Sequence, residues 1–412
     1  METHESISQG NYYPIIFGKV RKMNPNGNIA LVQEIMLDFA RLTKLESANA
    51  HPRRYLWTDA FAVCNYLEIF SRTNDKIYRD LALRLVEQVH FTLGRHRSDD
   101  ARCGWISDLD EREGAQHPTI GGLRIGKQLN ERRPGDPYNE RLEWEQDGQY
   151  YHYLTKWMHA LNCVGKVVGD QTYTRWAIEL AKTAHSRFTY TPPAGGRKRI
   201  YWKMSIDLSY PLVLSMGQHD PLDGFTTYNE LQAATGEFRD QSLPNLKLEI
   251  SDMAEICRDI SLVTVDPLGI GGLLFDASRL AHSIIQGSLK NVHLLETIVK
   301  SAQIGMEAFA TGDSLEYPGE CRLAFRELGL SIGLYAVENL LRWLEENPSL
   351  FYRDSYLYRL VVDFIDYMPF REKIQQFWLD RKNREIGTWI DHREINMVML
   401  ATSLAPGGFL MI

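Results

Sequence analysis

The chain has 412 residues, of which 44% are hydrophobic and 24% are charged, and its formal net charge is −7. This composition is typical of a soluble globular protein, and the lack of a basic block argues against nucleic acid as the main partner. No stretch of about 18 apolar residues predicts a membrane span. The start of the chain also lacks the basic and apolar regions of a secretory signal.

The five cysteines are scattered, and no two of them form a CxxC pair. Their spacing predicts neither a disulfide framework nor a zinc site, so we expect no metal and no cofactor. Cys64 and Cys163 lie within apolar helical patterns, where a cysteine is most simply a small buried residue. This cysteine usage suits a reducing, cytoplasmic location.

Apolar residues at helical spacing predict helices along the whole chain after an N-terminal extension, residues 1–26. The expected helices, in chain order, are 27–44, 57–72, 75–94, 152–168, 171–188, 204–217, 221–235, 268–285, 290–310, 323–345, 351–367 and 389–404. A further turn is expected near 251–260, and no alternating pattern predicts a strand. We expect residues 27–412 to form a single all-α domain.

Two of these segments, 74–90 and 169–185, resemble each other at a spacing of 95 residues. They share Asp, Tyr, Ala, Leu and His at matched positions. Each is preceded, across a short polar turn, by another apolar helix. The repeating unit is therefore a helical hairpin, which must stack with others to bury its apolar faces.

The connections between helices alternate in length. Short turns follow four of the helices, 57–72, 152–168, 268–285 and 323–345, whereas longer connections precede them, above all residues 95–151. This pattern predicts a closed ring of six hairpins with an inner and an outer layer. Inner helices are expected to begin near residues 57, 152, 204, 268, 323 and 389. Because loops carry function more often than the scaffold does, we expect the site on the long-loop rim.

Three segments resemble the N-acylglucosamine 2-epimerase group of the six-hairpin glycosidase superfamily: RRYLWTDAFAV at 53–63, CGWISDLDEREG at 103–114 and WIDHREINMVML at 389–400. The resemblance implies an (α/α)6 toroid and a catalytic histidine at the start of the last inner helix, here His392. One departure concerns the fourth inner helix, where the group carries a second catalytic histidine. This chain has Pro267 and Gly269 there but no histidine, which argues against a two-base 2-epimerase reaction.

The candidate catalytic residues are Asp59, Glu145 and His392. Asp59 opens the first inner helix, where an aspartate often only caps free N–H groups. Glu145 lies in a loop that mixes acids with aromatic residues, and the alternative for it is a solvated charged loop. His392 titrates near neutrality and suits acid–base work, although a hydrogen-bonded residue at a helix start is the alternative.

Acids interleaved with aromatic residues suit sugar binding, because rings stack on pyranose faces while carboxylates bind hydroxyl groups. The candidate substrate-binding residues on the rim are Arg53, Trp57, Trp105, Glu143, Tyr151, His152, Tyr201, Trp202, Asp207, Glu316, Arg322, Arg326 and Trp389. The segment HDPLDGF at 219–225 is interpreted as a capped turn on the opposite rim. GIGG at 269–272 is not a phosphate loop, since no strand precedes it and no GK[ST] follows.

These observations favour a carbohydrate-active enzyme that hydrolyses a glycosidic bond with two rim carboxylates. One alternative is a sugar epimerase or isomerase that uses His392. Another is a toroid that binds a ligand or partner without catalysis, since fold alone does not decide function. Arginines on the rim favour an anionic sugar such as a uronate or sugar phosphate, with a balanced salt-bridged surface as the alternative. The expected partner is a small sugar-like molecule.

Overall fold

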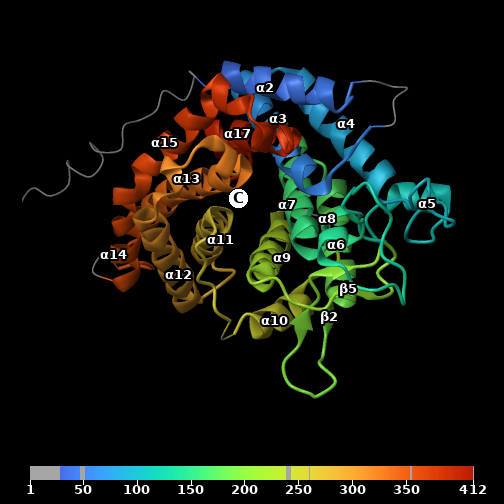
Figure 1. Ribbon diagram of the computed structural model, residues 1–412. Helices are drawn as coiled ribbons and strands as arrows, with labels where there is room; N and C mark the ends of the chain where they lie inside the picture. The colour runs from blue at the N-terminus through green and yellow to red at the C-terminus, as the bar shows by residue number, and fades with distance from the viewer. Residues whose placement is uncertain (1–27, 47–51, 238–242, 259, 353–354, 412) are drawn as a thin grey trace, which may run out of the picture.

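The computed structural model describes residues 28–46, 52–237, 243–258, 260–352 and 355–411. The expected N-terminal extension, residues 1–26, lies outside these ranges. Within them, helices are arranged as a ring of two layers (Figure 1), which confirms the predicted all-α toroid. None of the described helices combines the length and the apolar character that crossing a membrane requires.

The inner layer consists of α3 (Leu56–Thr73), α7 (Tyr151–Val168), α9 (Asp220–Glu237), α11 (Pro267–Ile285), α13 (Ala324–Glu346) and α17 (Arg393–Leu404). Each of these helices contacts the next in this order, and α17 contacts α3, so the inner ring closes. Inner helices are covered on all sides. In α3, for example, every side chain from Leu56 to Ile69 is buried.

The outer layer consists of α2 (Ile29–Leu42), α4 (Lys76–Leu93), α8 (Gln171–Phe188), α10 (Lys247–Ile256), α12 (Val292–Thr311), and a segment formed by α14 (Tyr356–Asp363), η3 (Phe364–Tyr367) and α15 (Met368–Leu379). Five of these pack against the inner helix that precedes them in the chain. The exception is α2, which packs against α17, so the first and last described helices join to complete the ring.

Short helices and strands lie in the connections between the long helices and after α17. The helical ones are α5 (Glu111–Gln116), α6 (Glu140–Glu145), η1 (Asp313–Glu316), η2 (Gly319–Cys321), η4 (Arg381–Arg384), α16 (Gly387–Ile390) and η5 (Pro406–Gly408). The strands are β1 (Gln149–Tyr150), β2 (Thr189–Tyr190), β3 (Arg199–Ile200), β4 (Lys203–Met204) and β5 (Pro211–Val213). They form two antiparallel sheets, one in the order β1-β4-β5 and one pairing β2 with β3. The first sheet joins the start of α7 to the segment before α9.

The expected helix at 204–217 is wrong, because these residues form β4, a turn and β5. Side chains close the turn: Ser205 Oγ accepts the N–H groups of Ser209 at 3.0 Å and Tyr210 at 3.2 Å. Leu208 has a φ of 58°, which does not fit a right-handed helix. Pro211 has no N–H to donate to a helical hydrogen bond. Local polar contacts therefore override the apolar periodicity here.

This error shifts one hairpin. The segment expected as an outer helix at 221–235 is the inner helix α9, and the turn expected near 251–260 belongs to the outer helix α10. The segment 219–225 therefore lies at the start of an inner helix, and its placement on the opposite rim is wrong.

The internal repeat corresponds to α4 and α8, two outer helices in equivalent positions. Their matched aspartates cap the helices: Asp75 accepts the N–H of Ile77 at 3.0 Å, and Asp170 accepts that of Thr172 at 2.9 Å. The matched histidines, His90 and His185, are both buried in the last turns. The repeat therefore reflects shared capping and shared burial at the two ends.

The C-terminal segment fills the ring from within. After α17 the chain turns through η5 and ends inside the ring (Figure 1). Phe409 stacks on Phe61 of α3 at a centroid distance of 4.2 Å and lies 4.5 Å from Phe275 of α11. These three rings form an aromatic floor across the inside of the ring.

Glycines bring α11 and α13 unusually close. A Cβ atom added to Gly271 would lie 2.1 Å from the carbonyl oxygen of Gly329, and one added to Gly333 would lie 2.4 Å from Cα of Gly271. The neighbouring Gly272 has open space, with no atom within 4 Å of such a Cβ. Backbone contact, rather than side-chain packing, therefore sets the distance between these two helices.

We expect Gly271→Ala to lower the free energy of unfolding by about 1–3 kcal/mol, because the added methyl group must push two inner helices apart. The matched control, Gly272→Ala, should be neutral or stabilising by up to about 1 kcal/mol, since alanine is the better helix former. Urea unfolding followed by circular dichroism measures both changes. Equal stability of the two variants would contradict the close packing described here.

Candidate active site

A cavity of about 380 Å³ lies inside the ring, at the end where the inner helices begin. Its floor is the aromatic layer of Phe61, Phe275 and Phe409. The indoles of Trp57 and Trp202 add apolar area to the lining. The cavity therefore lies on the predicted rim and offers flat rings to a ligand.

The first turns of α7 and α9 bring polar groups into this cavity. α7 starts directly after β1, and the N–H of Tyr151 donates to the carbonyl oxygen of Trp202 at 3.3 Å. This contact holds His152 and Trp202 at the same wall. α9 begins with Asp220 followed by Pro221, and proline suits the first turn of a helix because it needs no N–H partner there.

Asp220 carries the most unusual carboxyl group of the cavity. Burial, followed by the nearby charge of Asp223, raises the pKa of Asp220 to about 7. Its Oδ2 atom makes no hydrogen bond to the part of the chain that the structure describes. Its Oδ1 atom lies 3.9 Å from Nδ1 of His152. A carboxyl group of this kind can donate or accept a proton near neutral pH.

Two imidazoles lie beside this carboxyl group in the cavity lining. Burial lowers the pKa of His152 to about 4 and also lowers that of His219, so both rings are neutral at pH 7. Nε2 of His219 lies 2.9 Å from the carbonyl oxygen of Leu262. Because a carbonyl oxygen only accepts, Nε2 carries the hydrogen, and Nδ1 keeps the lone pair that acts as a base.

Asp223 differs from Asp220 because it has cationic partners. Burial alone would raise the pKa of Asp223, but the charges of Lys156 and Arg279 outweigh burial and lower it. Lys156 Nζ lies 2.7 Å from Oδ1, and the Thr155 hydroxyl donates to Oδ2 at 2.6 Å. Asp223 therefore remains a carboxylate, whereas Asp220, one helical turn before it, can become protonated near neutral pH.

Behind the cavity, Arg279 is almost fully buried, at 1% exposure, and lies among three acids. It contacts Glu230 at 2.6 Å, Asp276 at 3.2 Å and Asp223 at 3.6 Å. Burial raises the pKa of Asp276 to about 6 despite this contact. Of the three buried aspartates in the cavity wall, Asp223 is therefore ionised, whereas the protons of Asp220 and Asp276 are available near neutral pH.

The predicted catalytic residues lie elsewhere. Glu145 and His392 line a second hollow of about 390 Å³ together with Arg53. Asp59 is buried, accepts the N–H of Tyr55 at 3.0 Å and pairs with Arg54 at 3.6 Å. Burial raises the pKa of Asp59 to about 6. The structure therefore does not bring these three residues into the cavity, and their catalytic roles stay predictions.

Three predicted binding residues, Trp57, His152 and Trp202, line the cavity. Four predicted charged residues do not line the cavity and lie in ion pairs: Glu143 with Lys203 at 2.8 Å, Arg322 with Glu327 at 2.6 Å, Arg326 with Asp266 at 2.9 Å, and Glu316 with Lys373. Asp266, the ion-pair partner of Arg326, is itself a lining residue of the cavity.

The predicted aromatic residues outside the cavity pack against other rings or polar groups. The Arg95 guanidinium carbon lies 5.1 Å from the ring centroid of Trp105. The ring centroids are 4.0 Å apart for Tyr201 and Tyr190 and 5.8 Å apart for Trp389 and Trp378. The Tyr151 hydroxyl donates to the Tyr228 hydroxyl at 2.8 Å. These contacts give each ring a structural role.

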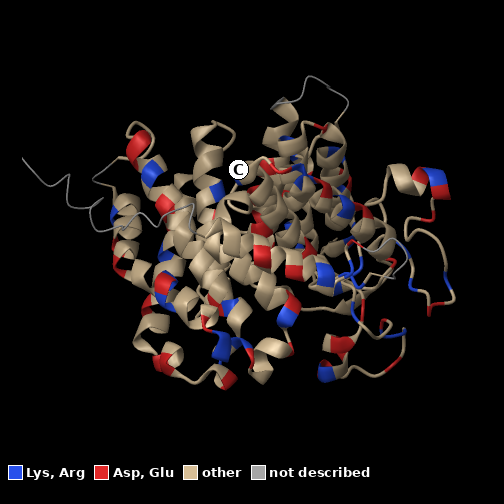
Figure 2. Ribbon diagram, turned by 90° about the horizontal axis from the view of Figure 1, so that it is seen from above, with Lys and Arg blue, Asp and Glu red and all other residues tan. Residues whose placement is uncertain are grey.

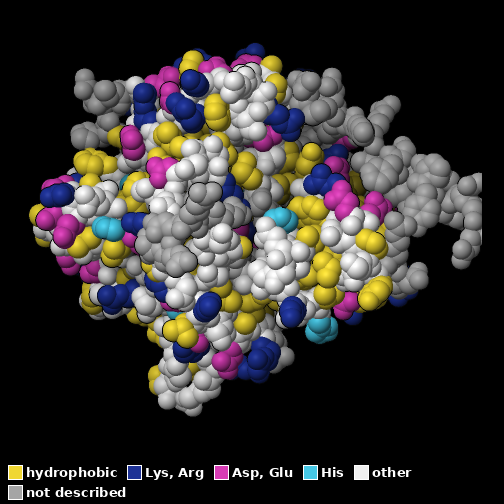
Figure 3. All heavy atoms as spheres, turned by 180° about the vertical axis from the view of Figure 1, so that it is seen from behind, with side chains coloured by type: hydrophobic (Ala, Val, Ile, Leu, Met, Phe, Trp, Pro, Cys, Tyr) yellow, Lys and Arg dark blue, Asp and Glu magenta, His cyan; other side chains and the backbone are white. Residues whose placement is uncertain are grey.

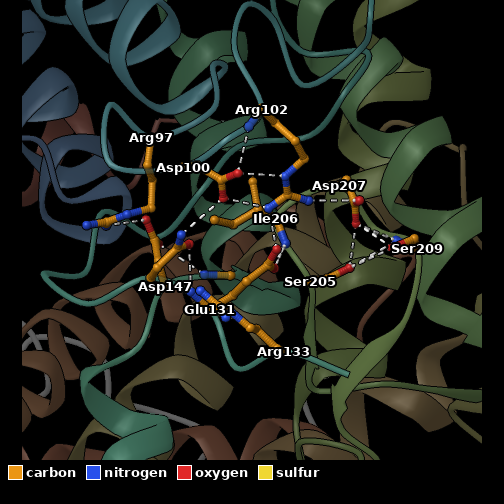
Figure 4. Close-up of polar contacts among 12 residues, drawn as sticks. Arg97, Asp100, Arg102, Glu131, Arg133, Asp147, Ser205, Ile206, Asp207 and Ser209 are labelled. Atoms are coloured by element: carbon orange, nitrogen blue, oxygen red, sulfur yellow. Dashed lines mark hydrogen bonds and ion pairs between the residues drawn. The ribbon is translucent and has the colours of Figure 1, made fainter. Parts of the chain in front are cut away.

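Asp207 belongs to a polar cluster that fastens the long loop 95–151 to the turn between β4 and β5 (Figure 4). At its centre, the Arg102 guanidinium contacts Asp207 at 2.9 Å, Asp100 at 2.9 Å and Glu131 at 2.5 Å. The Ser205 and Ser209 hydroxyls donate to Oδ1 of Asp207. Asp207 therefore orders the segment beside Trp202 and does not face the cavity.

The polar residues of the cavity lining that the sequence did not indicate include His219, Asp220, Asp223, Lys156 and Asp276. A signal was present, because HDPLDGF at 219–225 contains three of them. Because the sequence pattern predicts a helix at 204–217, it places this segment on the wrong rim and favours a helix cap there.

Charged residues of both signs are interspersed over the molecule. Lys and Arg alternate with Asp and Glu along the ribbon (Figure 2), and the visible part of the rear face shows both signs among hydrophobic side chains (Figure 3). Two of the arginines expected on the rim are paired, Arg322 with Glu327 and Arg326 with Asp266. This arrangement favours the salt-bridged alternative over an anion-binding rim.

No protein-family model and no curated protein matches the chain. Among solved structures, the chain is similar to a sugar epimerase from a ruminal bacterium. The similarity covers 91% of this chain and 98% of that one, with 11% sequence identity and a TM-score of 0.47. It is a similarity of overall fold.

We expect Asp220→Asn to become more stable relative to the wild type as the pH rises from 4 to 8. The raised pKa of Asp220 means that its stabilising contribution is complete below about pH 3.8 and is lost as the pH rises through about 7. Asparagine does not titrate, so the difference in unfolding free energy should grow by on the order of 2–4 kcal/mol. Urea unfolding at each pH measures it.

The matched control is Asp223→Asn, for which the sign is opposite. Asp223 has a lowered pKa, so its carboxylate stabilises the fold above the usual range for aspartate and loses this effect on acidification. This variant should be less stable than the wild type at pH 7, with a difference that shrinks toward low pH. The same pH trend in both variants would contradict the assignment of charge states.

Proposed function

We propose that this protein is an enzyme that transfers protons at a carbon atom of a small sugar-like substrate, as a sugar epimerase or isomerase does. The observation that carries the proposal is the group of Asp220, His152 and His219 in one cavity. The pKa of Asp220 is about 7, and the two imidazoles are neutral at that pH. Groups in these states can exchange protons with a substrate without a large energetic cost.

Epimerisation needs a base on each face of the carbon whose proton is removed and returned. His219 supplies one base through Nδ1, since its Nε2 hydrogen is engaged by the Leu262 carbonyl group at 2.9 Å. Asp220, with His152 at 3.9 Å, supplies the other proton donor and acceptor. We assign the catalytic roles to these residues in place of Asp59, Glu145 and His392.

The position of His219 also accounts for the missing histidine of the fourth inner helix. A Cβ atom added to Gly269 would lie 3.3 Å from Cε1 of His219, so this ring lies against the first turn of α11. The sequence resemblance implies a catalytic histidine at that turn. We infer that a histidine from the start of α9 takes its place in space, with the glycine leaving room for the ring.

The lining of the cavity suits a neutral sugar better than an anionic one. Trp57 and Trp202 offer rings for the apolar face of a pyranose, and aspartates offer acceptors for its hydroxyl groups. Four aspartates, Asp220, Asp223, Asp266 and Asp276, line the cavity, whereas Lys156 is the one Lys or Arg among its described lining residues and is paired with Asp223. A volume of about 380 Å³ is within the range of small-molecule sites.

Hydrolysis of a glycosidic bond is the second candidate, and one observation favours it. Asp276, whose pKa is about 6, and the ionised Asp223 line the same cavity and provide the acid and base carboxylates that hydrolysis requires. Arg279 contacts both, which holds them in fixed positions.

The proposal is tested by incubating the enzyme with neutral mono- and disaccharides in D2O and following C–H to C–D exchange by NMR. We expect exchange with at least one of these sugars. Asp220→Asn and His219→Gln should each slow it by about 100-fold or more. The control is His293→Gln, whose side chain is 89% exposed on an outer helix.

Release of new reducing ends without carbon exchange would replace the proposal with hydrolysis, and Asp276→Asn should then abolish the release. Exchange at wild-type rates in Asp220→Asn and His219→Gln would reject the assigned residues. Binding of a sugar with neither reaction would identify a non-catalytic toroid.

A further inference from the structure

Beneath the aromatic floor, three metal-ligating side chains meet in the interior of the ring. Cys64 comes from α3, and His159 and Cys163 come from successive turns of α7. The two sulfur atoms and one ring nitrogen all lie within 4.8 Å of one another. The side chains are at most 1% exposed. The His159 ring packs against Phe275 and Phe409, so the cluster and the cavity share the floor.

The spacing of these donor atoms fits a tetrahedral ion. Nε2 of His159 lies 3.6 Å from Sγ of Cys163. Bonds of about 2.1 Å to nitrogen and about 2.3 Å to sulfur at a tetrahedral angle place two such ligands about 3.6 Å apart. The cysteine and the histidine are four residues apart on one helix, so the backbone of α7 sets this distance.

A second set of contacts orients the imidazole toward the sulfur atoms. Nδ1 of His159 lies 3.1 Å and 3.2 Å from the two carboxylate oxygens of Glu230. Glu230 is held in turn by Arg279 at 2.6 Å and by the Asn162 amide at 2.9 Å. A carboxylate bonded to the outer nitrogen of a ligating histidine is the usual way in which proteins orient it and increase its basicity.

We infer that Cys64, His159 and Cys163 form a binding site for a thiophilic d¹⁰ cation, with Zn²⁺ as the best match. Two thiolates and an imidazole that has released its Nε2 hydrogen to make way for the ion balance the charge of a divalent cation, which suits a region without access to water. Without an ion, Nε2–H of His159 donates to the carbonyl oxygen of Phe409 at 2.8 Å, so a bound ion would take the place of this hydrogen. The carbonyl oxygen is the nearest candidate for a further ligand once the C-terminal segment has shifted.

The proposed ion has a structural role. It joins α3 to α7 and, through Phe409, fixes the floor on which a substrate would rest. Because the ligands are fully buried, the ion has to enter while these helices assemble, so its binding energy contributes to folding. The site is independent of the reaction in the cavity and would exist in a hydrolase or a binding protein as well.

The first test measures metal content. The full chain, prepared without a histidine tag or chelators, should contain one Zn²⁺ per molecule by mass spectrometry. Cys64→Ser and Cys163→Ser should each contain at most about one tenth of the zinc found in the wild type. The control is Cys103→Ser, since Cys103 is an exposed cysteine outside the cluster. Wild-type metal content in folded Cys64→Ser and Cys163→Ser would overturn the inference.

A second measurement does not depend on whether the variants fold. Wild-type protein refolded with Co²⁺ should show the sulfur-to-cobalt charge-transfer band of thiolate ligation together with the intense visible bands of a tetrahedral ion. Folded protein that takes up no cobalt, or that takes it up without the charge-transfer band, would overturn the inference. Loss of two hydrogen atoms on mild oxidation, with no metal uptake beforehand, would identify a disulfide pair instead.

Discussion

The inner ring depends on one buried guanidinium. Arg279 of α11 lies at 1% exposure and contacts Glu230, Asp223 and Asp276 at 2.6–3.6 Å. Buried charges are costly unless they are paired and hydrogen-bonded, and here each acid shares the same cation. Because Asp223 and Glu230 belong to α9, the guanidinium also joins α9 to α11 within the ring. A neutral side chain at this position would leave buried carboxylates without their partner, and the ring would have to open or protonate them.

Together with Lys156 and His159, the same cation keeps two of the buried acids charged. Asp223 and Glu230 have lowered pKa values, because the charges of Lys156, His159 and Arg279 outweigh the effect of burial. Asp220 has no cation in direct contact among the described residues and carries a pKa near 7. Cationic neighbours therefore keep Asp223 a carboxylate, whereas burial and the charge of Asp223 bring the pKa of Asp220 close to neutrality. Through Glu230 it also orients His159, so the cavity above the floor and the cluster below it share one ion-pair network.

Much of the architecture could be predicted from the sequence, and less of the site. Helical periodicity and alternating connection lengths correctly indicated a ring with its cavity at the start of the inner helices. They failed at residues 203–213, where Ser205 and Asp207 bond to the backbone and Pro211 excludes a helix, because such contacts leave no trace in apolar periodicity. That single error displaced His219, Asp220 and Asp223 from the predicted rim. The acids chosen in their place have partners distant in sequence, such as Lys203 for Glu143, which single-sequence patterns do not show.

The C-terminal segment explains why a ring of this size has a shallow cavity instead of a channel. An inner layer of six helices leaves space along its axis, and Phe409 fills that space by stacking on Phe61 and lying against Phe275. The ring of Phe409 belongs to the cavity floor, whereas its carbonyl oxygen accepts the Nε2–H of His159 at 2.8 Å. One residue after the last helix thus sets the depth of the cavity and closes the polar cluster beneath it. Any change in the contacts of His159 would therefore reach the cavity floor through the position of this single ring.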